Sequence, residues 1–153
     1  MRSAFLRPFS LAASVIGLAL VAPAAHAAVS CTELAPGLLA SPGVKSANSQ
    51  IIAASGPNVA HCRVDILYGE SDAQNINIRV GLPLNELDGG TGGVQGAWNG
   101  RTQGIGGGGC SGSLNVGGPV NAGYVGSGND TGHSGGNCAP GVNEDGTYNL
   151  QFI

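Results

Sequence analysis

Four consecutive glycines, Gly106–Gly109, are the residues of this sequence best suited to chemistry. Glycines in a row let the backbone approach a ligand closely and can point several N–H groups at one anion or oxyanion. A flexible loop is the plainer interpretation, because glycine is the commonest residue of turns. Which of the two applies depends on the elements before and after the run.

A second polar group contains Asp130, His133 and Ser134. The segment Gly132–Gly136 satisfies the G-x-S-x-G pattern of a serine nucleophile, but the apolar strand and the helix that must flank such a turn are missing. We therefore reject Ser134 as a nucleophile. Without a nucleophile in reach, Asp130 and His133 are interpreted as a polar pair that fixes a glycine-rich loop rather than as a catalytic dyad.

Two nucleotide-binding patterns are also excluded. Gly104–Gly109 matches G-x-G-x-x-G, but no helical pattern follows it and no suitable acidic residue lies about 20 residues further on. No Gly-Lys-Ser or Gly-Lys-Thr follows the glycines, which excludes a P-loop.

Arg101 is interpreted as either the organiser of a buried pair or a cation at the edge of a substrate site. His61 is predicted to be a surface residue at the start of a strand.

The four cysteines predict two disulfides, because their number is even and the chain carries an export signal. Three pairings are open to Cys31, Cys62, Cys110 and Cys138. We favour Cys31–Cys62 with Cys110–Cys138, since each pair closes a loop of about 30 residues, which the chain-entropy relation makes worth roughly 3–4 kcal/mol. Zinc is the rival interpretation, but the cysteine and histidine spacings fit no zinc finger, and no metal site is expected.

The elements that must position these residues are mostly strands. Residues 62–68 are β-rich, and residues 75–82 alternate between apolar and other side chains. The short polar linker between them predicts a hairpin. Shorter strands are expected within 98–105 and 123–127.

Helices are not predicted before Tyr148, because no 11-residue window of the mature chain has helical apolar spacing. Residues 28–57 carry repeated proline and glycine turn signals and are predicted to be loop with short elements. Glycine is concentrated further on: 21 of the 28 glycines lie between Gly89 and Gly141, without the strict third-residue period of collagen.

The first 27 residues have the features of a secretory signal peptide. A basic start and a short apolar run precede the A-x-A cleavage site Ala25–Ala27, so we expect a secreted or periplasmic protein cleaved after Ala27. The remaining 126 residues carry four basic and nine acidic residues, a net charge of −5. This charge excludes a basic surface for nucleic acid, and no membrane partner is expected after cleavage.

Three segments, taken in order, resemble the N-terminal part of the tannase and feruloyl esterase family. They are His61–Val64, Ala97–Gly109 and Gly123–Gly136. Each segment is a weak signal alone, whereas their order and spacing are specific, and the resemblance covers essentially all of the mature chain. Thr102 departs from the family, which commonly has an aromatic residue after Trp-Asn-Gly-Arg.

The resemblance implies a secreted serine esterase with an α/β-hydrolase core that cleaves aromatic esters such as gallates and ferulates. It predicts an α/β fold class, with residues 28–153 as the incomplete N-terminal part of that core, built mostly of β-strands and Gly-rich loops. It also implies that Cys31 and Cys62 form the N-terminal disulfide of the family. The residues that match the oxyanion loop of the family are Gly107, Gly108 and Gly109.

The same resemblance places the catalytic triad and the inserted lid beyond residue 153. No catalytic residue and no cofactor is therefore assigned to this chain; calcium, which the family often binds in the lid, is expected only there. The expected partner of the complete enzyme is a small aromatic ester, and the chain alone is expected to be inactive. The alternative is a small exported, glycine-rich, disulfide-bonded binding or structural module that is complete as written.

Overall fold

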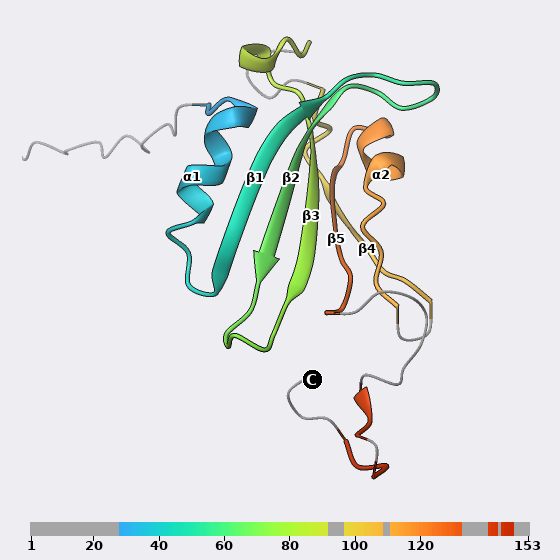
Figure 1. Cartoon of the computed structure of the whole chain (residues 1–153). Helices are drawn as coiled ribbons and strands as arrows, with labels where there is room; N and C mark the ends of the chain where they lie inside the picture. The colour runs from blue at the N-terminus through green and yellow to red at the C-terminus, as the bar shows by residue number, and fades with distance from the viewer. Residues whose placement is uncertain (1–27, 92–96, 109–110, 133–140, 144, 149–153) are drawn as a thin grey trace, which may run out of the picture.

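A five-stranded mixed sheet with strand order β1-β2-β3-β5-β4 organises the computed structural model (Figure 1). The structure describes residues 28–91, 97–108, 111–132, 141–143 and 145–148. The strands are β1 (Val44–Ile52), β2 (His61–Tyr68), β3 (Ile76–Pro83), β4 (Thr102–Ile105) and β5 (Val125–Asn129). Pairing is antiparallel from β1 through β5, whereas β4 and β5 are parallel. A mixed sheet with few helices is compatible with part of an α/β fold.

The predicted hairpin is confirmed as β2 and β3. Its antiparallel register pairs Cys62 with Leu82 and Val64 with Val80, so the apolar residues of both strands share one face of the sheet. The two short strands expected nearer the C-terminus are present as β4 and β5. β4 begins later than expected because Trp98–Arg101 forms a turn that precedes the strand.

The prediction of loop for residues 28–57 is wrong for β1, a nine-residue strand. Its sequence is mostly polar because β1 is an edge strand with many partly or fully exposed side chains. Pairing with β2 from Ser46↔Leu67 to Ile52↔His61 supplies the backbone hydrogen bonds that the apolar pattern does not reveal.

The core on one face of the sheet is centred on the Cys31–Cys62 disulfide. The predicted bond is present between η1 (Cys31–Glu33) and β2, and its two cysteines are 1% and 2% exposed. Val64 is buried beside it, and six partly buried hydrophobic residues complete the cluster: Leu34, Leu38, Ile66, Val80, Leu82 and Leu84. The disulfide therefore fixes η1 and α1 (Leu34–Leu38) against the sheet. Cys110 and Cys138 lie outside the described residues.

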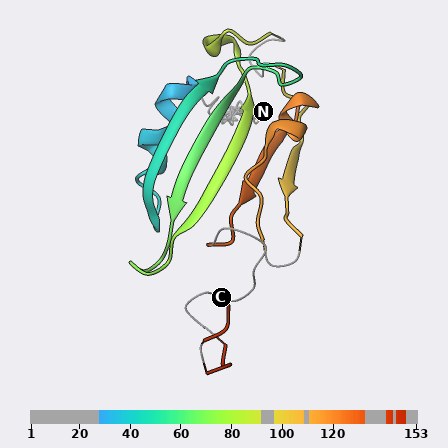
Figure 2. The ribbon, with the colours of Figure 1, turned by 45° about the vertical axis from the view of Figure 1, so that its right-hand side comes forward.

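The opposite face is covered by α2 (Gly117–Asn121), which no helical pattern predicts (Figure 2). The sequence Gly-Gly-Pro-Val-Asn has poor helix propensity, so packing must hold this helix in place. Val116 and Val120 are buried against Gly81 of β3, whose lack of a side chain lets them reach the sheet. α1 and α2 thus lie on opposite faces, because Gly81 and Leu82 are neighbours on one strand and point in opposite directions.

The predicted signal peptide, residues 1–27, lies outside the described residues. Among the residues that are described, no helix has both the length and the apolar character needed to cross a membrane. η2 (Glu86–Asp88) completes the short helical elements.

Replacing Gly81 with alanine should destabilise the protein by about 1–3 kcal/mol, the usual cost of an overpacked contact. An added Cβ would lie 2.6 Å from Val120 Cγ2 and 2.8 Å from Val116 Cγ2. Gly104→Ala is the matched control, because nothing lies within 4 Å of a Cβ at that strand position. Urea unfolding followed by the fluorescence of Trp98, the single tryptophan, measures both. Equal midpoints for the two variants would contradict the α2 packing described above.

The double variant Cys31→Ala/Cys62→Ala should lose about 3–4 kcal/mol of stability, because the bond closes a long loop of the unfolded chain. The two residues are 31 positions apart in sequence. The same urea titration measures the loss, and the unmodified protein with a reducing agent should show at least as large a decrease, because the reductant also opens the predicted Cys110–Cys138 bond. An unchanged midpoint in both cases would show that the core does not depend on this bond.

Candidate functional site

The carboxyl ends of β4 and β5 form the edge of the sheet to which the sequence motifs converge. The two strands are parallel and in register from Thr102↔Val125 to Ile105↔Gly128. The segments that follow them, Gly106–Gly108 and Asp130–Gly132, therefore leave the sheet side by side. In open sheets with parallel strands, ligands bind outside the carboxyl ends of the strands. This edge is the candidate site.

A hollow of 360 Å³ lies at this edge. Its lining comes from the adjoining ends of three strands and from the first glycine after β4: Ile78, Gly104, Ile105, Gly106, Ser127, Gly128 and Asn129. Three of these residues are glycines, so much of the lining is backbone. A site of this kind offers peptide N–H and C=O groups rather than charged side chains to a ligand.

The glycine loop after β4 is held by a close backbone approach. A Cβ on Gly107 would lie 1.9 Å from the carbonyl oxygen of Ser111, so only glycine allows the two segments to touch. Ser111 in turn donates from N (3.3 Å) and Oγ (2.9 Å) to the carbonyl oxygen of Gly108. Among the described residues, the N–H groups of Gly107 and Gly108 donate to no acceptor. Gly109 lies outside the described residues.

Asp130 fastens the end of β5 to the start of β3. Its Oδ1 accepts from the N–H of Asn77 (2.9 Å) and of Gly132 (2.9 Å), and its Oδ2 accepts from Asn77 Nδ2 (2.6 Å). The Asp130 N–H also donates to the Asn77 carbonyl oxygen at 3.0 Å. This carboxylate is thus occupied by structural donors. No sequence motif marks Asn77, although its place at the start of a predicted strand makes it a natural partner for a residue that ends an antiparallel neighbour.

The turn after Asp130 contains the one residue other than glycine with a positive φ among the described residues, Thr131 (φ 58°). A β-branched residue rarely adopts this conformation. Asn129 Oδ1 accepts from the Thr131 N–H at 2.9 Å, and Thr131 Oγ1 donates to the Asp130 carbonyl oxygen at 2.6 Å. These bonds turn the chain away from the sheet directly at the candidate site. His133 and Ser134 lie outside the described residues.

The turn Trp98–Arg101 positions β4 at its amino end. Trp98 Nε1 donates to the Arg101 carbonyl oxygen at 2.8 Å, and Asn99 Oδ1 accepts from the Arg101 N–H at 2.9 Å. Asn99 Nδ2 also donates to the Ala122 carbonyl oxygen at 3.0 Å, which ties this turn to the turn before β5. Asn99 therefore sets the relative position of two parallel strands. The Asn-Gly sequence predicts a turn here but not this link between the strands.

Two expectations for basic residues are wrong in part: Arg101 as the organiser of a buried pair, and His61 as a surface residue, although His61 does begin β2 as predicted. Arg101 is exposed, and its side chain has no hydrogen bond or ion pair among the described residues, so it organises no buried pair there. It also lies at the amino end of β4, at the opposite edge from Gly106. His61 is 8% exposed rather than a surface residue. Its Nδ1 lies 3.0 Å from the Val59 carbonyl oxygen, which requires the proton to be on Nδ1.

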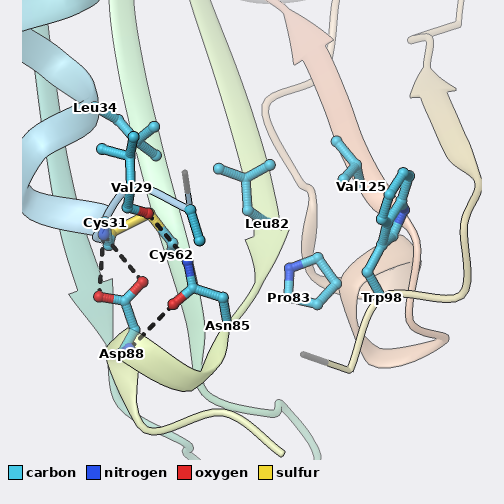
Figure 3. A pocket seen from close by; sticks show the side chains of 11 residues that line it. Val29, Cys31, Leu34, Cys62, Leu82, Pro83, Asn85, Asp88, Trp98 and Val125 are labelled. Carbon is cyan, nitrogen blue, oxygen red and sulfur yellow. Dashed lines mark hydrogen bonds between the residues drawn. A yellow bond between two sulfur atoms is a disulfide. The ribbon is translucent and has the colours of Figure 1, made fainter. Parts of the chain in front are cut away.

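An apolar pocket of 470 Å³ lies at the amino ends of β4 and β5 (Figure 3). Trp98 and Val125 form one wall, and the Cys31–Cys62 disulfide lies at the other. Its polar groups serve structural roles. Both carboxylate oxygens of Asp88 lie 3.0 Å from the backbone nitrogen of Cys31 and accept its N–H. This N–H is at the start of η1 and has no acceptor within the helix.

Within the described segments, no group of three or more His, Cys, Asp or Glu side chains is arranged to hold a metal ion. The pocket beside the disulfide contains one carboxylate, that of Asp88, and it is bonded to the backbone. The candidate site at the carboxyl ends of β4 and β5 therefore rests on backbone groups.

No protein-family model matches the chain, and no curated protein matches its sequence. A solved structure that the chain does resemble is the tannin acyl hydrolase from Aspergillus niger, with a TM-score of 0.51 and 18% sequence identity. The match covers 71% of this chain and 21% of that structure, so the chain spans about a fifth of its length. At this identity the likeness is one of fold.

Replacing Asp130 with alanine should release the end of β5 from β3. Because each hydrogen bond to a charged acceptor contributes more than a neutral one, amide exchange at Asn77 and Gly132 should accelerate about tenfold or more. Asp145→Ala is the matched control, since that carboxylate accepts from Thr147 in a separate turn. Hydrogen exchange measured by NMR checks both. Unchanged exchange at Asn77 in the Asp130 variant would contradict the role assigned to this carboxylate.

Proposed function

We propose that the chain is part of a serine-type carboxylic ester hydrolase for aromatic esters of the gallate or ferulate kind, and that it supplies the oxyanion-binding side of the active site. The observation that carries this proposal is the glycine loop after β4. The N–H groups of Gly107 and Gly108 have no acceptor among the described residues, and they follow directly from the carboxyl end of a strand. The fold likeness to a tannin acyl hydrolase supports the same class of reaction.

The chemistry of this loop follows from the transition state of ester hydrolysis. Attack on an ester carbonyl moves negative charge onto its oxygen, and donors already aimed at that position stabilise the charge without reorganising. In hydrolases with an α/β core, the loop after an early strand provides one such backbone donor. The contact between Gly107 and Ser111 holds the loop backbone in place, which is the preorganisation that this role requires.

On this proposal, the nucleophile comes from elsewhere in the protein. Among the described residues, no serine or cysteine at this edge has a histidine beside it. Within the described part of the chain, β4 pairs with β5 on one side only, and Thr102–Gly104 are exposed. We propose that a further strand, beyond residue 153, pairs with the open edge of β4 and carries the nucleophile to the glycine loop. The acid and the base of the triad would then follow it in the sequence.

Export agrees with this function. We propose that residues 1–27 are removed after Ala27 and that the protein acts outside the cytoplasm. The Cys31–Cys62 disulfide supports this placement, because such bonds form and persist in oxidising compartments.

The test compares residues 1–153 with the product of the whole coding region, using methyl gallate and ethyl ferulate as substrates. We expect no hydrolysis by residues 1–153 and hydrolysis by a longer product. In that product, Gly108→Pro should lower kcat about 10²–10³-fold, because it removes one backbone donor. Gly108→Ala is the matched control, since it keeps the N–H and nothing lies within 4 Å of its Cβ.

Hydrolysis by residues 1–153 alone would overturn the assignment of the nucleophile to a later segment. Equal rates for the proline and alanine variants would overturn the role of the glycine loop. A coding region that ends at Ile153, together with cooperative unfolding and no hydrolysis, would favour a small exported binding or structural module instead.

A further inference from the structure

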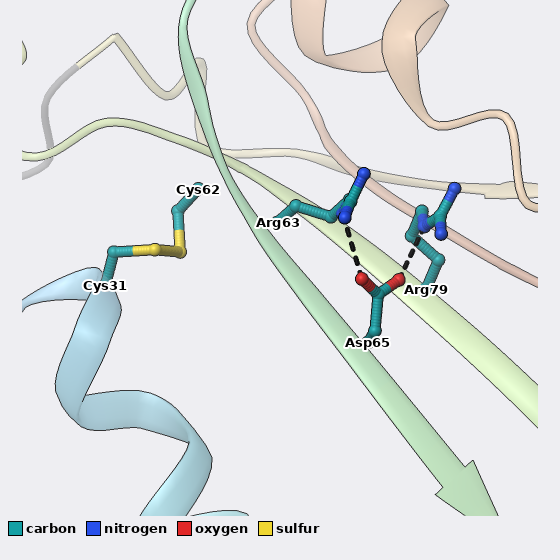
Figure 4. A network of polar contacts seen from close by, with 5 residues as sticks. All are labelled: Cys31, Cys62, Arg63, Asp65 and Arg79. Atoms are coloured by element: carbon teal, nitrogen blue, oxygen red, sulfur yellow. Dashed lines mark hydrogen bonds and ion pairs between the residues drawn. A yellow bond between two sulfur atoms is a disulfide. The ribbon is translucent and has the colours of Figure 1, made fainter. Parts of the chain in front are cut away.

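The basic residues of the mature chain are unevenly placed. Only four follow the signal peptide, against nine acidic residues. Two of the four, Arg63 on β2 and Arg79 on β3, lie on the sheet face that α2 covers, each diagonal to the other across the β2–β3 pairing. Figure 4 shows them on the opposite side of β2 from the disulfide. Half of the mature positive charge is thus gathered on one small area of a negatively charged chain.

One carboxylate serves both guanidinium groups. Arg79 Nε lies 2.6 Å from Asp65 Oδ1, and Arg63 Nε lies 2.8 Å from Asp65 Oδ2 (Figure 4). Arg79 Nε donates a hydrogen bond to Asp65. Arg63 Nε is buried and forms an ion pair with the same carboxylate, but it donates no hydrogen bond. A single carboxylate balances one of two positive charges, so the cluster keeps a net charge of +1.

The outer nitrogens of both guanidinium groups remain available. In the part of the chain that the structure describes, Nη1 and Nη2 of Arg63 and Arg79 donate to no protein acceptor. Both side chains are 29% exposed, so a ligand can reach them from solvent. The planar fork of arginine matches a carboxylate, which can accept two parallel N–H donors.

These groups line a groove of 480 Å³ between the sheet and the segment that leads into α2. In the described part of the chain, its lining contains two arginines and a histidine but no acidic residue: Ile52, Ala53, Ser55, Asn58, His61, Arg63, Arg79, Leu114, Asn115, Val116 and Gly117. Ile52, Leu114 and Val116 provide apolar walls. The groove therefore combines a singly positive end with an apolar body, the arrangement expected of a site for an amphipathic anion.

We propose that this groove binds a small organic monocarboxylate with an apolar body. The net charge of +1 matches one carboxylate, and the apolar walls would be wasted on inorganic phosphate or sulfate. The groove shares no lining residue with the hollow at the carboxyl ends of β4 and β5, although Arg79 pairs with Gly128, which in turn pairs with Ile105 at the end of β4. Val116 and Gly117 belong both to the groove and to the start of α2, so a bound acid would also hold α2 against the sheet.

The test uses benzoate as the probe and benzamide as its neutral counterpart. A ligand that binds only the native state stabilises it by mass action. Saturable binding to the disulfide-bonded full chain therefore raises the urea midpoint. For a less stable variant, it raises the folded yield. We expect benzoate to raise the midpoint and benzamide not to. Arg63→Lys and Arg79→Lys keep the charge but lose the fork, and each should weaken benzoate binding about tenfold.

Two further variants separate a ligand site from a purely structural ion cluster. Asp65→Asn removes the carboxylate that competes for the arginines, so it should tighten benzoate binding even if the protein loses stability. Arg101→Gln is the control, because Arg101 is exposed and does not line the groove, and it should leave binding unchanged. These results are independent of esterase activity, so they do not depend on the proposed function.

Four outcomes would overturn the proposal. They are no midpoint shift with benzoate, equal shifts with benzoate and benzamide, benzoate affinity in both lysine variants equal to that of the unmodified protein, and benzoate affinity in the Asp65 variant that is no higher than in the unmodified protein. Tighter binding of phosphate or acetate than of benzoate would show a general anion site without a role for the apolar walls, which also contradicts it.

Discussion

The pairing of β3 with β5 is the constraint on which the rest of the structure depends. It runs from Ile78↔Asn129 to Gly81↔Gly126 and joins the N-terminal antiparallel strands to the parallel pair. A glycine on each strand leaves room for Val116 and Val120, so α2 can pack across this junction. Asp130 closes one end of the junction through Asn77. Without this pairing, the glycine loop after β4 would have no fixed position relative to the core.

Two sites with different chemistry lie near this junction. At the carboxyl ends of β4 and β5, the lining is mostly backbone, and the free donors are peptide N–H groups. On the sheet face that α2 packs against, charged side chains dominate, because Arg63, Asp65 and Arg79 project from neighbouring positions on β2 and β3. Backbone donors suit a transient oxyanion, whereas arginine forks suit a stable carboxylate. One small sheet can therefore serve both a reaction step and a binding step without the two sites sharing a residue.

The parts of the fold that could be predicted from sequence are those in which local pattern and burial agree. Ile76, Ile78, Val80 and Leu82 alternate because one face of β3 is buried, so both the strand and the hairpin follow. β1 could not be predicted in this way, since an edge strand needs no apolar face. α2 could not either, because its helix is imposed by Val116 and Val120 on Gly81, against its own propensity.

The candidate site could be predicted only in part. The glycine run is visible in the sequence. The contact of Gly107 with Ser111, and the N–H groups of Gly107 and Gly108 that have no acceptor among the described residues, can be seen only in the three-dimensional structure. Part of the arginine groove does have a sequence signal, because Arg63 and Asp65 are two positions apart on a predicted strand and must share a face. Arg79 joins them only through the register of β2 with β3, which single-strand patterns do not reveal.

The central claim is that the N–H groups of Gly107 and Gly108 bind the oxyanion of an ester. A crystal structure of the whole gene product with an aromatic phosphonate bonded to its nucleophile tests it most directly. The account predicts that the anionic phosphonyl oxygen lies about 2.7–3.1 Å from at least one of these two backbone nitrogens. A phosphonyl oxygen held entirely by other donors, with the Gly106–Gly108 backbone turned away from it, would contradict the account.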